Sequence, residues 1–293
     1  MTDSTIADAP ITNGEVDVPG SEFDTGPIDW SVVRVMLSRD LGAIVRSKAL
    51  VLPMLFLPVV LLVLLPASIG LAANGKTLQP DRFLDMLPSQ MADPIMNYPP
   101  DERLIILVLG YLVAPLFLIV PLMVSAVTAS DTFAGEKERR TLETLLHLPI
   151  RDRDLYVSKL LGGFIPAVAV SWGGFVLFAI ISNIVSWPVM HRLFLPTVLW
   201  AILIFWVAPA VAALGLGIMV RVSVRVNNTQ EAQQLGGAVV LPLVILAVGQ
   251  TTGLLLAGPV VSFTAGAIVW VIAIALNVRG ARAFTRDRMA TRL

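Results

Sequence analysis

Six long, continuous apolar stretches are the feature that most constrains how this chain folds. An α-helix rises about 1.5 Å per residue, so about 20 apolar residues in a helix cross a hydrocarbon core about 30 Å thick. The composition agrees, because 56% of the 293 residues are hydrophobic and only 14% are charged, against roughly 25% charged in soluble domains. We therefore predict an all-α fold, a polytopic membrane helical bundle of six spans. The expected spans are residues 49–71, 104–129, 161–183, 195–220, 236–257 and 262–279, with one long span plus a re-entrant segment as the alternative for the last two.

The distribution of basic residues predicts the orientation of this bundle. The 21 Lys and Arg residues lie outside the six stretches or at their edges, and all but Lys76, Arg82, Arg103 and Arg192 fall on one side. Because cytoplasmic loops of membrane proteins carry the excess of Lys and Arg, we expect both the N- and the C-terminus to be cytoplasmic. The sequence thus predicts a multi-pass protein of the plasma (cytoplasmic) membrane.

The segments that flank the spans differ in character. Residues 1–29 hold seven acidic and no basic side chains, which predicts a disordered acidic tail. Apolar residues recur at three- and four-residue steps over 30–48, which predicts an interfacial amphipathic elbow helix, or else a cytoplasmic extension of the first span. The six-span domain is expected over 49–285, and residues 280–293 form a basic cytoplasmic tail suited to the anionic headgroups of membrane lipid.

Catalytic motifs do not emerge from the sequence, with one misleading match. Residues 70–77 fit the phosphate-binding pattern G-x-x-x-x-G-K-T, but such a loop needs a strand before it and a helix after it. Here a proline-containing apolar span precedes it, so we interpret the match as coincidence. The two histidines, His147 and His191, are expected on opposite sides of the membrane, and the chain has no cysteine. We therefore expect no catalytic residue, no bound cofactor and no metal site in this chain.

The connector over 130–160 is the most informative polar stretch. It carries six acidic and six basic residues, a mixture that lacks the one-sided charge by which nucleic acid or phosphate is bound. Three leucines, Leu142, Leu145 and Leu146, form a short apolar ridge, and Pro149 ends that helix. The pattern favours contact with another protein, and a solvated helical hairpin is the alternative.

Two stretches of the sequence resemble a known family. Residues 133–139 (FAGEKER), 141–146 (TLETLL), 149–150 (PI) and 159–160 (KL) look like the motif of type 2 ABC-transporter permeases. Residues 228–236 (NTQEAQQLG) are similar to the second cytoplasmic connector of the same family. The departures are small, since Arg140 stands where a small residue is common and His147 is not a motif residue.

This resemblance implies a permease subunit of an ATP-driven exporter that does not itself hydrolyse ATP. It implies a separate ABC ATPase subunit, expected in two copies, which would bind ATP and Mg²⁺, and a second permease half that is either a second copy or a paralogue. By resemblance, residues 135–149 form a first coupling segment and residues 227–235 a second one. The residues expected to couple to the ATPase are Gly135, Glu136, Glu138, Arg139, Thr141, Glu143, Leu145, Leu146, Pro149, Gln230, Glu231 and Gln233.

Two other functional classes remain open at this stage. A secondary carrier or channel would need no ATPase, although ion-coupled carriers usually keep ionisable groups inside their spans. An intramembrane enzyme, such as a glutamate-dependent protease, would need paired acidic residues and histidines near the spans, and Glu136 and Glu138 lie in a connector. The apolar interiors of the spans favour, as a hypothesis, a lipophilic or amphipathic substrate over a bare metal ion.

Overall fold

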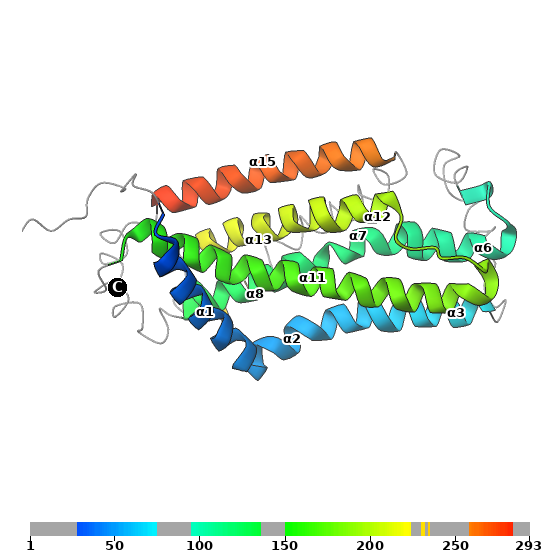
Figure 1. Cartoon of the computed structure of the whole chain (residues 1–293), viewed down its shortest axis with the longest axis horizontal. Helices are drawn as coiled ribbons and strands as arrows, with labels where there is room; N and C mark the ends of the chain where they lie inside the picture. The colour runs from blue at the N-terminus through cyan, green and yellow to red at the C-terminus, as the bar shows by residue number, and fades with distance from the viewer. Residues whose placement is uncertain are drawn as a thin grey trace, which may run out of the picture.

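The computed structural model describes residues 28–74, 95–135, 150–223, 230, 231, 234 and 258–283 of the chain. No β-strand occurs within these residues, which confirms the all-helical expectation for them. The helical elements, shown in Figure 1, are α1 Trp30–Arg46, α2 Lys48–Val59, η1 Val60–Leu64, α3 Leu65–Asn74, α6 Pro100–Ile105, η2 Ile106–Leu112, α7 Val113–Phe117, α8 Ile119–Ala129, η3 Ser130–Gly135, α11 Asp152–Met190, α12 Val198–Ile202, η4 Leu203–Val207, α13 Ala208–Ser223 and α15 Pro259–Ala283, where η marks a π-helical turn.

Five helical rods in the described part of the chain are long and apolar enough to cross a membrane. They coincide with five of the six expected spans, and the remaining one, 236–257, lies outside the described residues. The five rods run over Met54–Leu71, Pro100–Thr132, Asp152–Met190, Val198–Ser223 and Pro259–Ala281.

The third rod departs most from the sequence prediction. The expected span of 161–183 lies inside α11, a single helix of 39 residues. Its polar first turns continue the helix because neighbouring helices cover them, and both Asp154 and Lys159 are almost completely buried. Hydropathy detects only the apolar, lipid-covered part of a helix. The polar start of α11, which neighbouring helices cover, was therefore assigned to the connector.

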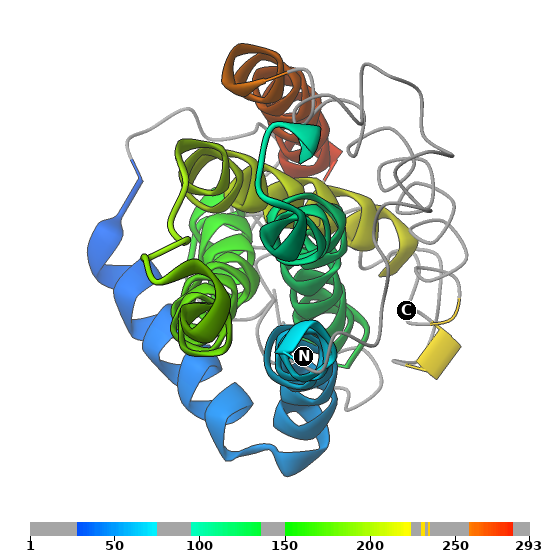
Figure 2. The same cartoon turned by 90° about the vertical axis from the view of Figure 1, so that its right-hand side faces the viewer.

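The rods form a bundle in which the second rod, Pro100–Thr132, is the most buried, and α11 contacts several neighbours. This helix packs against α8, α3, α13 and α1, while α13 also packs against α8 and α15. Figure 1 shows the long helices lying side by side, with α1 crossing obliquely at the end where α11 begins. Viewed along the bundle in Figure 2, α15 lies at the periphery, beyond the rod formed by α12 and α13. We call the end that holds the start of α11 and the ends of α13 and α15 the basic end.

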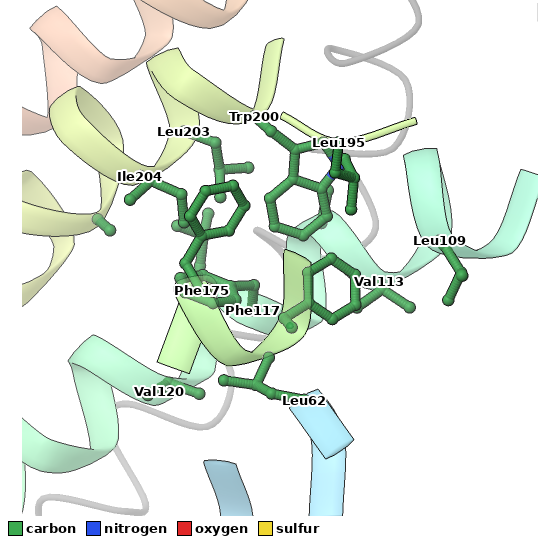
Figure 3. Packing of buried hydrophobic residues seen from close by; sticks show 14 of the residues in the cluster. Leu62, Leu109, Val113, Phe117, Val120, Phe175, Leu195, Trp200, Leu203 and Ile204 are labelled. Carbon is green, nitrogen blue, oxygen red and sulfur yellow. The ribbon is translucent and has the colours of Figure 1, made fainter. Parts of the chain in front are cut away.

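An aromatic cluster holds four of the rods together. The Trp200 ring lies 5.7 Å from Phe117, 5.5 Å from Phe175 and 4.9 Å from Phe178, measured between ring centroids. Leu62 of η1 is buried in the same apolar cluster (Figure 3). The cluster therefore joins the first, second, third and fourth rods through contacts between buried apolar side chains.

The fourth rod and α15 run in the same direction. The Trp206 indole donates to the Phe263 carbonyl near the start of both elements, and the Asn277 amide donates to the Ala213 carbonyl further along both. Because the two helices are parallel, the end of α13 and the start of α15 lie at opposite ends of the bundle (Figure 1).

Helix α1 occupies the expected elbow region. Its Val33, Met36 and Ile44 are buried, and α1 packs on α11, whereas Trp30 is 63% exposed and Val45 is 76% exposed. The carboxylate of Asp29 caps the helix by accepting the backbone N–H of Ser31 at 3.0 Å. Residues 30–46 are thus helical, and the buried side chains of α1 face the bundle.

Candidate coupling site

The structure describes three of the twelve residues predicted to couple to an ATPase. Gly135 is buried and ends η3, while Gln230 and Glu231 are helical and exposed. The other nine residues, Glu136, Glu138, Arg139, Thr141, Glu143, Leu145, Leu146, Pro149 and Gln233, lie outside the described residues. The structure does describe the helices next to the two coupling segments, namely η3 and the start of α11 for the first segment and the end of α13 for the second.

The first coupling segment follows directly from the second rod. Helix α8 continues into η3, so the chain stays helical up to Gly135. Ser130 and Thr132 of η3 are buried, the Ser130 hydroxyl donates to the Ala126 carbonyl at 2.8 Å, and η3 packs against both α13 and α11. π-Helical turns are rare and often occur at functional positions. The connection to the first coupling segment is therefore fixed to the bundle up to its last described residue.

Small residues let α8, α11 and α13 approach one another closely in the part of the bundle next to η3. A Cβ placed on Gly215 would lie 2.4 Å from the Ser125 hydroxyl oxygen, and one on Gly163 would lie 2.5 Å from Leu216 Cδ2. The Thr128 hydroxyl donates to the Val124 carbonyl at 2.8 Å. Small residues permit such close approach of membrane helices. Both α8 and η3 are thus in direct packing contact with α11 and α13.

The first coupling segment rejoins the bundle beside the start of α1. A cavity of about 430 Å³ lies there, lined by residues of both helix starts, among them Trp30, Ile150 and Arg151. The backbone N–H of Asp29 donates to the Asp154 carboxylate at 3.2 Å, which ties the two helix starts together. Hydrogen bonds from Ser31 hold the pKa of the Asp29 carboxyl below its ordinary value, so this cap is ionised at neutral pH. The elbow is therefore attached next to the point where the first segment returns.

The second coupling segment begins just beyond Arg221, a residue that the sequence assigned to a connector. The structure places Arg221 in the last turn of α13, where its guanidinium donates to the carbonyls of Gly217 and Leu276, both at 2.8 Å. The Asn277 amide donates to Ala213 and the Tyr156 hydroxyl donates to the Asn277 carbonyl at 3.2 Å. Three rods therefore meet at this polar cluster, and an arginine directly after an apolar run was its one sequence signal.

Comparison with known families decides the class of the protein. Residues 34–277 match the sequence model of a family described as ABC-2 family transporter protein, which covers most of the chain. The chain belongs to the ABC-2 transporter family. The resemblance inferred from the coupling motifs is thereby confirmed, and a comparison with curated proteins found no match. ABC-2 membrane proteins are components of transport systems that work with an ABC ATPase subunit and are generally not catalytic themselves.

At the other end of this ABC-2 bundle, polar side chains fix the connections between rods. Arg192 forms an ion pair with Glu102 of α6. The Asn183 side chain accepts the backbone N–H groups of Phe194 at 2.8 Å and Leu195 at 3.1 Å, and it donates to the Leu195 carbonyl at 2.8 Å. Asn183 could not be identified from the sequence, because a single amide near the edge of an apolar run forms no recognisable pattern.

The described residues contain no group of three or more His, Cys, Asp or Glu side chains that could hold a metal ion. The start of the phosphate-binding match, Gly70, lies within α3, and the Val185 side chain occupies the space beside it. Backbone N–H groups within a helix bond to carbonyls of the preceding turn and are not free to bind phosphate, whereas residues 75–77 of the match lie outside the described residues. The interpretation of that match as coincidence agrees with the helix.

Proposed function

We propose that this ABC-2 protein is the permease subunit of an ATP-driven exporter, moved by a separate ATPase that grips its two coupling segments. The observation that supports this most is that the first coupling segment leaves from η3 and returns to the start of α11, both of which are packed into the bundle. A force applied to that segment would reach three rods at once. The ATPase, expected in two copies, would bind ATP and Mg²⁺, and a second permease half would complete the pathway.

The proposal includes six spans with both termini in the cytoplasm. Support comes from the parallel course of α13 and α15, which needs one further crossing between them. Residues 224–257 exceed the about 20 residues that a crossing helix requires, and the apolar run 236–257 lies within them. The arginines at the basic end, among them Arg151, Arg221 and Arg279, agree with a cytoplasmic position for that end.

The outer surfaces of the rods suit lipid or the second permease half. Large apolar side chains are exposed on three rods, with Phe56 71% exposed, Ile184 67% and Val271 68%. Such surfaces are unfavourable in water and ordinary in a bilayer or an apolar interface. The exposed Trp30 on α1 fits a helix at the membrane surface, because tryptophan favours the level of the headgroups.

Copurification with the ATPase tests the proposal. The double variant Glu138→Arg with Arg139→Glu reverses two charges of the first coupling segment, and we expect it to lose ATPase association while its thermal stability in detergent stays unchanged. The double variant Glu102→Arg with Arg192→Glu is the matched control, because it reverses a pair at the opposite end of the bundle. Equal recovery of the ATPase with both variants would contradict the proposed role of the segment.

Reconstitution in proteoliposomes tests transport itself. We expect a lipophilic or amphipathic substrate to stimulate ATP hydrolysis by the complex, and screening a panel of such compounds against metal ions identifies the class. Substrate movement that follows an ion gradient and persists without the ATPase would instead establish a secondary carrier. We expect residues 135–149 to be labelled by a membrane-impermeant reagent only from the cytoplasmic side. Labelling of these residues from the outside would refute the proposed orientation.

A further inference from the structure

The last span, α15, is fastened to the fourth rod along its length. At its start, the Trp206 indole donates to the Phe263 carbonyl and stacks on the Phe263 ring with 4.9 Å between centroids. The Trp270 indole donates to the Trp206 carbonyl at 3.1 Å. Near its end, the Asn277 amide and the Arg221 guanidinium bond across the same pair of helices. The two helices are thus joined by directional bonds at both ends.

Among the described residues that bond α15 to the fourth rod, Arg221 is the one that carries a charge. Arginine near the end of a membrane helix can extend to the interface, whereas one that points into the bundle pairs with other groups and commonly has a function. The guanidinium has five donors in a fixed plane and stays charged. Here it bridges one carbonyl of its own helix and one of α15, 55 residues further along the chain. Both carbonyls lie toward helix C-termini, where a positive charge is favourable.

Contacts with the other rods of the described bundle are few for α15. Its substantial packing is with α12, η4 and α13, all parts of the fourth rod, and Figure 2 shows it at the periphery. From α11, the Tyr156 hydroxyl reaches the Asn277 carbonyl. The close approach of α13 to α15 is possible because a Cβ on Gly217 would already lie 3.1 Å from Leu276 Cβ.

We propose that Arg221 is a positioning residue that makes the last span move together with the fourth. The second coupling segment starts shortly after Arg221, so displacement of that segment by the ATPase pulls the end of α13, and the guanidinium carries α15 with it. This inference rests on the proposed function, since the ATPase supplies the displacement. Without the bridge, α13 would move and the end of α15 would lag behind it.

Distance measurements on the complex with its ATPase test this idea. Two probes attached at Val222 and Val278 report on the distance between the ends of α13 and α15, and a second pair at Ala169 and Val278 reports on α15 against α11. Genetically encoded azide-bearing residues carry the probes, so that cysteine stays available for a cross-link. In the unaltered complex we expect the Val222–Val278 distribution to be equally narrow with and without trapped ATP, while the Ala169–Val278 distance shifts.

The variant Arg221→Ala is expected to broaden the Val222–Val278 distribution and to lose most of the ATP-induced shift of α15. Arg221→Lys keeps the charge but has no planar fork, so an intermediate broadening is expected, and this variant serves if Arg221→Ala does not fold. A disulfide between Gly217→Cys and Leu276→Cys should restore the shift in the Arg221→Ala background. Disulfides have a Cβ separation of about 3.5–4.5 Å, and a Cβ placed on Gly217 would lie 3.1 Å from Leu276 Cβ, so a small shift of the helices admits the cross-link. The serine pair at the same positions is the control.

The outcomes separate the two proposals. An unchanged distribution and a retained shift in Arg221→Ala would overturn the role of Arg221, as would a cross-link that forms without restoring the shift. Absence of any ATP-induced shift in the unaltered complex would refute the proposed function and the movement of α15 with it. The width of the Val222–Val278 distribution, measured without ATPase or nucleotide, still decides whether Arg221 holds the two helices together.

Discussion

Replacement of Gly215 by alanine tests the close approach of α8 and α13, on which the proposed transmission of force from the first coupling segment depends. The added Cβ would lie 2.4 Å from Ser125 Oγ and 2.9 Å from Leu122 Cδ1. Real Cβ atoms are not found so close to other heavy atoms, so the helices or the side chains must move. The Ser125 hydroxyl is also held by its hydrogen bond to the Leu122 carbonyl at 2.8 Å, which resists that movement.

The expected cost follows from three contributions. Overpacking a close-packed interior costs about 1–3 kcal/mol, and loss of one side-chain hydrogen bond in a membrane protein costs about 0.6 kcal/mol. Alanine gains about 1 kcal/mol of helix propensity over glycine. Gly173→Ala in α11 is the matched control, because nothing lies within 4 Å of its added Cβ and it keeps only this gain. Gly215→Ala should therefore be about 2–4 kcal/mol less stable than Gly173→Ala.

Thermal unfolding in detergent measures this difference. For a chain of this size about 1 kcal/mol changes the Tm by about 2–4 °C, so Gly215→Ala should unfold at least about 4 °C below the control. Adding Ser125→Ala removes the closest atom and should recover most of the loss, which makes the two sites strongly coupled in a double-mutant cycle. Equal Tm values for Gly215→Ala and Gly173→Ala, or additive effects in the cycle, would refute the geometry described for these helices.

Three further predictions concern other parts of the bundle. Asp29→Ala should speed hydrogen exchange of the first-turn amides of α1, whereas Asp29→Asn keeps a capping oxygen and therefore the protection. Because the pKa of Asp29 is lowered in the folded protein, this protection should be present at neutral pH in the unaltered chain. It should fall only as the pH drops through the lowered pKa. Asn183→Ala should speed exchange of the Phe194 and Leu195 amides, and Asn183→Asp, which still accepts both N–H groups, should protect them; equal exchange in the two variants would contradict the hydrogen bonds described. Trp200→Ala should destabilise the protein by about 3–5 kcal/mol, while Trp200→Phe should cost far less in the same unfolding assay, since its Nε1 has no hydrogen-bond partner within the described structure.

Much of the fold and part of the site were predictable from the sequence. Lipid imposes a minimum length of apolar helix, so runs such as 104–129 and 195–220 locate spans without any knowledge of their neighbours. The motif around 133–150 was sufficient to indicate the family, which the match over 34–277 confirms. The coupling role of all twelve residues remains a prediction, and nine of them lie outside the described residues.

Tertiary structure decided what those helices do to one another. Hydropathy placed Arg221 in a connector, because a sequence profile cannot show that the Leu276 carbonyl accepts a hydrogen bond from its guanidinium. The same reason hid Asn183, whose partners lie on the next connection, and the burial of Asp154 at the start of α11. The lipid bilayer requires each span to be apolar over a minimum length, and this requirement is visible in the sequence of that span alone. Hydrogen bonds between helices depend on which carbonyl lies beside which donor after the helices have packed.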